Sequence, residues 1–176
     1  MRVISVFGGS HPRPGQPEYQ LAYELGRRLA EAGLTVATGG YIGTMSAVSQ
    51  GAADSAANSG VIGVTCDEIE GWRPVRPNRW ITREIRYRTL LERMAHLVAK
   101  NDGIIALSGS VGTLAEVALA WNQLLVNVIP PRPFILLGEQ WRRILDVFLA
   151  YAPVTESHRA LVQLADTPEE AVALVT

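Results

Sequence analysis

Short apolar runs alternate with amphipathic segments along this chain of 176 residues. Most of the runs have the length of a β-strand and stop at or near a glycine or a proline, as strands do before tight turns. Between the runs, apolar residues recur every three or four positions, which predicts amphipathic helices. The predicted strands cover residues 3–7, 34–38, 61–65, 103–107, 134–137 and 161–164, and the predicted helices cover 19–32, 45–58, 82–100, 114–126, 140–151 and the segment after Thr167.

This alternation of strands and helices predicts βαβ units, in which parallel strands form one sheet and helices cover both of its faces. The strands are apolar almost throughout, as expected where both faces of a sheet are buried. We therefore predict a single α/β domain over residues 1–176, built as a Rossmann-like, doubly wound parallel sheet in three α/β/α layers. A chain of this length can form a complete hydrophobic core.

Two glycine-rich turns follow predicted strands, one at residues 39–44 and one at residues 108–113. In a parallel sheet both turns lie at the carboxyl edge, where open α/β sheets bind ligands. Glycines let the backbone approach a ligand closely, and the helix that starts after each turn directs unpaired N–H groups towards it. The expected occupant is an anion, most naturally a phosphate.

The second turn is followed by a carboxylate. Glu116 lies about 6 Å along the helix axis from Gly112 and on the same face, at roughly 1.5 Å per residue. This position beside the expected anion favours a functional role, because a neutral side chain would suffice for folding there. The alternative is an exposed acid that the dipole of the helix favours in its first turn.

Arg93 is expected to reach the same place. The predicted helix falls roughly 10 Å from Arg93 to its end, and the next strand climbs back roughly 13–16 Å to the level of the 108–112 turn. A guanidinium and a carboxylate that converge on a phosphate-sized turn would form a site. The spacing also allows another arrangement, in which Arg88 pairs with Glu92 and Arg93 makes a surface or dimer salt bridge.

Residues 66–81 break the regular pattern, with two tryptophans, two prolines and little periodicity. A long irregular segment at the ligand edge of a sheet is often a lid or a binding loop. A surface loop pinned by the two tryptophans explains the composition equally well.

The composition narrows the classes of function. The formal net charge of −1 argues against a protein that works on nucleic acid or on an anionic membrane. We find no apolar stretch of membrane-spanning length and no signal peptide before the first strand. The single cysteine, Cys66, excludes an internal disulfide and suits a reducing compartment, so we expect a cytoplasmic protein.

Several other chemistries are disfavoured by the residues present. His11, His96, His158 and Cys66 are scattered without the spacing of metal ligands, so no metal site is expected. A P-loop is absent, since Gly-Lys-Ser/Thr does not occur. Pyridoxal-phosphate chemistry needs a Schiff-base lysine, and the only lysine, Lys100, is predicted at the sheet edge opposite the glycine turns. No cofactor is expected.

The order and spacing of these motifs resemble the LONELY GUY family of cytokinin-activating nucleotide phosphoribohydrolases, long mislabelled as lysine decarboxylases. The family pattern Pro-Gly-Gly-x-Gly-Thr-x-x-Glu stands here as Ser-Gly-Ser-Val-Gly-Thr-Leu-Ala-Glu at 108–116, and its upstream Glu-Arg pair stands as Glu92-Arg93. Its Gly-Gly-x-x-Gly-x-Met turn matches residues 39–45. Its opening strand and Gly-Ser exit match 3–10, and Tyr19 falls where the family has a tyrosine.

The resemblance, which runs from about residue 3 to 137, implies hydrolysis of the N-glycosidic bond of an AMP-like nucleoside 5′-monophosphate by a homodimer or larger homo-oligomer. Glu116 would hold the ribose hydroxyls or activate the attacking water, Arg93 would orient Glu116 or assist the departing base, and Glu92 would be a helper. The residues implied to bind the phosphate and the nucleotide are Gly9, Ser10, Gly39, Gly40, Gly43, Thr44, Gly109, Ser110, Val111, Gly112 and Thr113.

Two departures from the family pattern keep a second function open. Ser108 replaces the proline and Ser110 replaces the second glycine. A serine at a position that needs positive φ would cost about 1 kcal/mol or more, so either the turn differs here or the dihedral is not required. Ser110 could also offer its hydroxyl to a phosphate. The alternative function is that of the molybdenum-cofactor carrier proteins, which are similar in sheet and turns and would hold a nucleotide or pterin cofactor without cleaving it.

Overall fold

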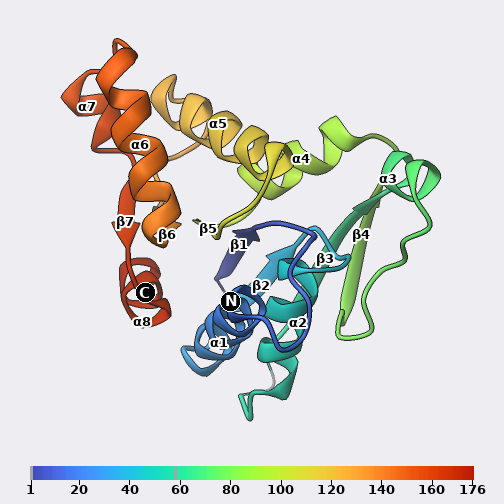
Figure 1. Cartoon of the computed structure of the whole chain (residues 1–176). Coiled ribbons are helices and arrows are strands. Elements are labelled where there is room, and N and C mark those ends of the chain that lie inside the picture. The colour runs from blue at the N-terminus through green and yellow to red at the C-terminus, as the bar shows by residue number, and fades with distance from the viewer. Residues whose placement is uncertain (1, 58) are drawn as a thin grey trace.

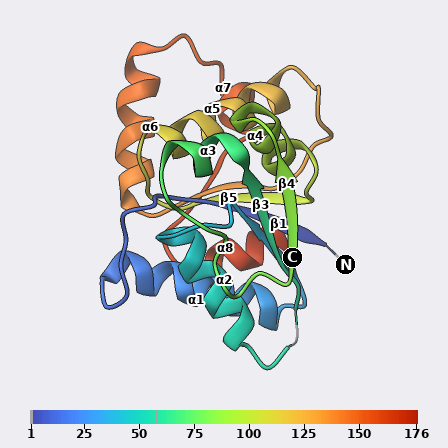
Figure 2. The same cartoon turned by 90° about the vertical axis from the view of Figure 1, so that its right-hand side faces the viewer.

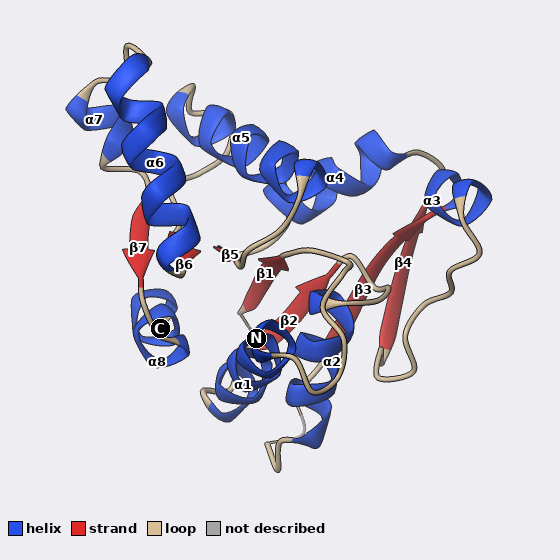
Figure 3. Cartoon of the chain, in the orientation of Figure 1, coloured by secondary structure: helices blue, strands red, loops and turns tan. Residues whose placement is uncertain are grey.

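The computed structural model describes residues 2–57 and 59–176, and its centre is one seven-stranded parallel sheet (Figure 1; strands in red in Figure 3). Every neighbouring pair of strands is parallel. The prediction of a doubly wound parallel sheet is confirmed. Across the sheet the order is β4 (Arg83–Tyr87), β3 (Val61–Cys66), β2 (Thr35–Thr38), β1 (Val3–Phe7), β5 (Gly103–Ala106), β6 (Phe134–Leu137) and β7 (Gln163–Ala165).

Helices cover both faces of the sheet (Figures 1 and 2). On one face, α1 (Pro17–Glu31), α2 (Thr44–Asp54) and α8 (Pro168–Val175) pack in one hydrophobic cluster with the alternate strand residues Ile4 and Ile105. On the other face, α4 (Leu90–Ala99), α5 (Val111–Leu125) and α6 (Glu139–Tyr151) pack in a second cluster with Ile104 and Phe134. The three-layer arrangement therefore follows from strands that bury side chains in both directions. The remaining helices are α3 (Asp67–Trp72) and α7 (Glu156–Arg159).

The predicted helix at 82–100 is wrong in its first half. Residues 83–87 form β4, an edge strand paired with β3, and α4 begins only at Leu90. An edge strand tolerates charged side chains, and Arg86 of β4 pairs with Asp67 and Glu70 of α3. The start of α4 is marked by a capping box, in which Thr89 Oγ1 accepts from the Glu92 N–H and the Glu92 carboxylate accepts from the Thr89 N–H.

Smaller differences concern the ends of elements. Helix α2 ends at Asp54, and its predicted end, Asn58, lies outside the described residues. The segment 66–81 contains the short helix α3, and α7 was not predicted. Helix α8 starts as predicted, because the Thr167 side chain accepts a hydrogen bond from the Glu170 N–H at 3.2 Å.

The reversal of strand order lies at β1, between β2 and β5. Helices α1 and α2, which follow β1 and β2, lie on one face of the sheet. Helices α4 and α5, which precede and follow β5, lie on the other face (Figure 2). At such a switch point the connections diverge and leave a crevice at the carboxyl ends of the strands. Here the turns after β1 and β5 meet, with the Gly9 N–H donating to the Ser108 carbonyl at 3.1 Å.

Candidate functional site

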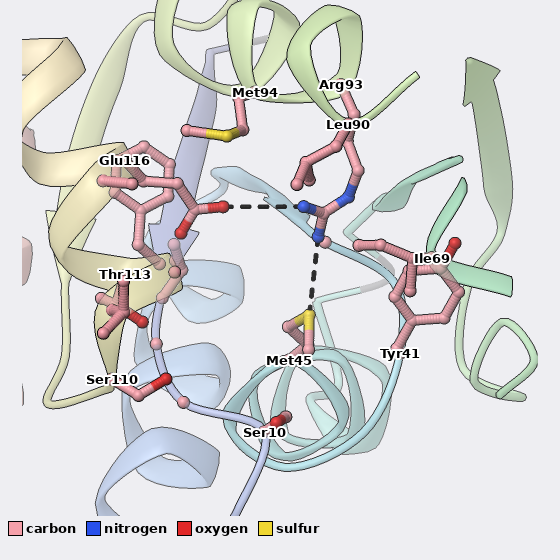
Figure 4. A pocket seen from close by; sticks show the side chains of 18 of the residues that line it. Ser10, Tyr41, Met45, Ile69, Leu90, Arg93, Met94, Ser110, Thr113 and Glu116 are labelled. Atoms are coloured by element: carbon pink, nitrogen blue, oxygen red, sulfur yellow. Dashed lines mark hydrogen bonds and ion pairs between the residues drawn. The ribbon is translucent and has the colours of Figure 1, made fainter. Parts of the chain in front are cut away.

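A cavity of about 370 Å³ opens at this switch point (Figure 4). Its size is at the lower end of the range for small-molecule sites. Its walls come from the turns after β1 and β2, from α3 and α4, and from the first half of α5. The predicted site residues that line it are Gly9, Ser10, Gly39, Arg93, Ser110, Val111, Gly112, Thr113 and Glu116.

Arg93 and Glu116 meet across the cavity, with 3.7 Å between Arg93 Nη1 and Glu116 Oε1 (Figure 4). Their side chains are only 6% and 12% exposed, so the predicted convergence is confirmed and the alternative of a surface salt bridge for Arg93 is wrong. Arg93 is anchored on the sheet, because its Nε donates to the Val64 carbonyl of β3 at 2.8 Å. Its Nη2 lies 3.9 Å from the Met45 sulfur, and the guanidinium stands 5.8 Å from the centre of the Tyr41 ring.

Gly39 makes the space that Arg93 occupies. A Cβ atom at this position would overlap Arg93 Nη2 and the sulfur of Met45. The backbone of Gly39 does not have positive φ, so the requirement for glycine here is steric. The first glycine of the 39–44 turn therefore positions the arginine of the site.

Burial controls the charge of Glu116. The carboxyl is shielded from water, which raises its pKa to about 7, while the nearby Arg93 cation acts in the opposite direction. A carboxyl with a pKa near neutrality can hold or release a proton at physiological pH, which is the property required of a general acid or base.

The first turn of α5 closes the cavity on the side of Thr113. Ser110 is the N-cap residue, and among the described residues no side chain caps this end of the helix. The backbone N–H groups of Val111, Gly112 and Thr113 precede the first hydrogen bond of the helix, which runs from Leu114 N to the Ser110 carbonyl. These donors and the positive end of the helix dipole are available to an anion.

The serine substitutions do not strain the turn. Ser110 is extended, with φ −105° and ψ −159°, and Ser108 has no positive φ either. The turn therefore does not use the left-handed dihedral that would exclude serine. Gly109 is required for a different reason, since a Cβ there would overlap the hydroxyl of Thr113.

The structure keeps five predicted residues out of the cavity wall: Gly40, Gly43, Thr44, Gly109 and Glu92. The Thr44 N–H donates to the Gly9 carbonyl at 2.9 Å, and a Cβ on Gly43 would lie 2.5 Å from the same oxygen. The end of the 39–44 turn thus packs against the turn after β1, and Gly40 packs against Thr65 and Gly63 of β3. The carboxylate of Glu92 is occupied in the capping box of α4.

Sequence reasoning missed the apolar and cationic wall of the cavity. Ile69, Trp72 and Arg73 come from α3 and the residue after it, and Leu90 and Met94 come from α4 (Figure 4 shows Ile69, Leu90 and Met94). The only signal was the aperiodic segment 66–81, for which a binding loop was one of two explanations. The contribution of this segment to the wall depends on where α3 packs in the folded chain, which the sequence pattern does not show.

The described residues hold no group of three or more His, Cys, Asp or Glu side chains placed to bind a metal ion. Among the helices in residues 2–57 and 59–176, none combines the length and the apolarity that crossing a membrane requires.

Fold and site together define a Rossmann-like α/β protein with a small-molecule-sized cavity at the switch point of its sheet. Residues 1–130 match the family described as the SLOG cluster4 family, and the chain belongs to that family.

Relatives with named activities extend this result. The chain is 28% identical over 182 residues to the cytokinin riboside 5′-monophosphate phosphoribohydrolase of Rhodococcoides fascians, covering 99% of this chain and 89% of the relative. It is 30% identical over 181 residues to the cytokinin riboside 5′-monophosphate phosphoribohydrolase LOG of Oryza sativa subsp. japonica, covering 97% and 71%. The resemblance to the LONELY GUY family is confirmed.

A solved structure is similar as well. The molybdenum cofactor binding protein of the phototrophic bacterium Rippkaea orientalis has a TM-score of 0.76 and 27% identity to this chain. The likeness covers 99% of this chain and 94% of that one.

Proposed function

We propose that the protein hydrolyses the N-glycosidic bond of a nucleoside 5′-monophosphate, releasing the free base and ribose 5-phosphate. The observation that carries this proposal is the buried pair of Glu116 and Arg93, 3.7 Å apart, in a cavity that also receives the uncapped start of α5. A carboxylate and an anion site within one small cavity suit a substrate that joins a sugar to a phosphate. The named activities of the two phosphoribohydrolase relatives support the proposal.

In the reaction, a water oxygen forms a bond to C1′ of the ribose while the bond from C1′ to the base breaks. The base leaves with the bonding electrons and takes up a proton, and the water supplies the hydroxyl of ribose 5-phosphate. The transition state has oxocarbenium character, so positive charge develops on the ribose. An ionised Glu116 beside the ribose stabilises that charge strongly, because the buried site has a low effective dielectric constant. Glu116 is thus the proposed catalytic residue, as a stabiliser of charge or as the base that activates water.

Arg93 acts on Glu116. Its cation favours the ionised carboxylate, and its anchor on the Val64 carbonyl fixes the direction from which it does so. The first turn of α5, with Thr113 and Ser110, holds the 5′-phosphate.

The experiment is to incubate the protein with a panel of nucleoside monophosphates and to measure free base by chromatography. Base release is expected from the wild type, and Glu116→Gln is expected to lower kcat by roughly 10²–10³-fold with a modest change in nucleotide affinity. Glu116→Gln keeps the shape of the side chain, so loss of turnover with retained binding separates chemistry from folding. Undiminished turnover in Glu116→Gln would contradict the assignment of Glu116.

A second candidate function is that of a carrier that binds a phosphorylated pterin or nucleotide without cleaving it. The likeness to the Rippkaea orientalis molybdenum cofactor binding protein favours it. Binding of nucleotides by the wild type with no base released from any of them would support the carrier.

We further propose that the protein works as a homo-oligomer. Leu90 and Leu91 of α4 and Val111 and Leu114 of α5 are 40%, 71%, 80% and 49% exposed, on two helices that pack against each other beside the cavity. Such a concentration of exposed apolar side chains is typical of a surface that another chain covers.

A further inference from the structure

Arg73 is a cation of the cavity whose charge no carboxylate balances. It follows α3 directly and lines the cavity together with Ser10 and the start of α5. Among the described residues, no Asp or Glu side chain forms an ion pair with it, whereas Arg93 faces Glu116. With one carboxylate and two guanidinium groups in its wall, the cavity carries an excess positive charge that favours an anionic ligand.

The hydrogen bonding of Arg73 is incomplete. A guanidinium has five N–H donors. The only hydrogen bond of this side chain within the described residues runs from Nη1 to Ser10 Oγ, and at 3.4 Å it is long. Its Nε is shielded from solvent and has no partner. Because this shielding also keeps a ligand away from Nε, the donors left for a ligand are the other N–H groups of Nη1 and Nη2, which bond to no described residue.

The backbone and Trp72 hold Arg73 in place for such an acceptor. The Arg73 N–H donates to the Ile69 carbonyl at 3.1 Å, and its own carbonyl accepts from the Val75 N–H at 2.8 Å. The guanidinium also stands 5.3 Å from the centre of the Trp72 ring, within cation–π range. The side chain is therefore directed at Ser10 by contacts that need no ligand.

We infer that Arg73 recognises the phosphate of the substrate, a phosphomonoester dianion held between its guanidinium, Ser10 and the first turn of α5. Arginine binds phosphate through two N–H groups at once, and the free donors of Arg73 match that geometry. The inference rests on the proposed function and deepens it, because it makes the phosphate a condition of binding. It assigns to the segment 66–81 the selection of nucleotides over nucleosides.

The test compares Arg73→Gln with Arg76→Gln, a matched loss of charge on the same segment at an exposed arginine outside the cavity wall. Calorimetry would measure the binding of AMP in the Glu116→Gln background, in which AMP is not turned over. The binding of ribose 5-phosphate and of adenosine would be measured in the wild-type background. Each measurement would be repeated after adding Arg73→Gln or Arg76→Gln. Arg73→Gln is expected to weaken the binding of AMP and of ribose 5-phosphate by roughly 10- to 100-fold and to leave the affinity for adenosine unchanged. Arg76→Gln should change none of the three.

Arg73→Lys provides a further check, since it keeps the charge but loses the paired donors. It should recover part of the affinity for AMP, with a steeper dependence on salt. In a protein that turns over, Arg73→Gln should raise KM more than it lowers kcat.

If Arg73→Gln weakens the binding of AMP and of adenosine equally, the role of Arg73 is structural and the inference is overturned. The inference is also overturned if the Arg73→Gln protein binds AMP as tightly as the protein with Arg73. If the wild type binds AMP but releases no base, the proposed hydrolysis fails while the role of Arg73 stands. If it binds neither AMP nor ribose 5-phosphate, both proposals fail.

Discussion

At the scale of single residues, the ionisation of Glu116 connects the structure to a measurable pH dependence. Burial raises the pKa of this carboxyl to about 7 and Arg93 lowers it. If the ionised carboxylate of Glu116 is the active form, kcat/KM should rise with pH through about 7 and level off at higher pH. Arg93→Ala removes the cation that favours ionisation, so its residual activity should need a higher pH.

The measurement is a pH–rate profile of base release for the wild type and for Arg93→Ala. Activity that falls as pH increases through 7 would mean that the protonated carboxyl is the working form. An unchanged profile in Arg93→Ala would contradict the proposed action of Arg93 on Glu116.

Gly39 offers a test of how closely Arg93 must be placed. Gly39→Ala puts a methyl group into the volume of Arg93 Nη2, so the guanidinium must leave the position in which it faces Glu116. Turnover should fall by roughly 10- to 100-fold, because small displacements in a site have effects of this size. Gly71→Ala in α3 is the control, since a Cβ there meets no atom within 4 Å. Base release and thermal unfolding would be measured for both variants. Normal turnover in Gly39→Ala would show that the position of Arg93 is not critical.

At the scale of elements, α4 carries Arg93 and begins with the capping box of Thr89 and Glu92. Thr89→Ala should lower the free energy of unfolding by about 1 kcal/mol, the usual effect of losing an N-cap side chain. Glu92→Gln should have a smaller effect on stability and leave turnover near that of the wild type, because this carboxylate bonds to Thr89 outside the cavity. Denaturant unfolding and base-release assays measure the two effects. Loss of turnover in Glu92→Gln comparable to that in Glu116→Gln would restore Glu92 as a catalytic helper.

The pattern of hydrophobic residues located most elements correctly, because helix and strand periods are local properties. It failed at residues 83–87, where charged residues outnumber apolar ones and only Ile85 and Tyr87 are apolar, so the segment was joined to the helical period of α4. The pairing of Ile85 with Val64 on β3 makes this segment a strand, and the pairing partner is far away in the sequence. The Thr-x-x-Glu signature at Thr89 was the available signal for the true start of the helix.

At the scale of the whole molecule, the apolar surface of α4 and α5 leads to a prediction about assembly. The wild type should form dimers or larger homo-oligomers at micromolar concentration, measured by light scattering after size exclusion. Leu91→Glu places a charge on the 71% exposed Leu91 and should favour monomers, because a buried unpaired charge is unfavourable at an interface. Val147→Glu, on the exposed face of α6, is the control with the same charge and should not change the mass. A monomeric wild type would contradict the prediction.

The sequence by itself determined the parallel α/β architecture, the placement of both glycine turns at one sheet edge, and the level of Arg93 beside the 108–112 turn. These follow from local periodicity and from the fixed rise of helices and strands, which set the level of each residue relative to the sheet. Only the tertiary structure decided which groups face the cavity. The Gly9 carbonyl accepts a hydrogen bond from the Thr44 N–H, α3 brings Arg73 to Ser10, and burial raises the pKa of Glu116. The local sequence pattern does not show these effects, because each depends on residues that are distant in the chain.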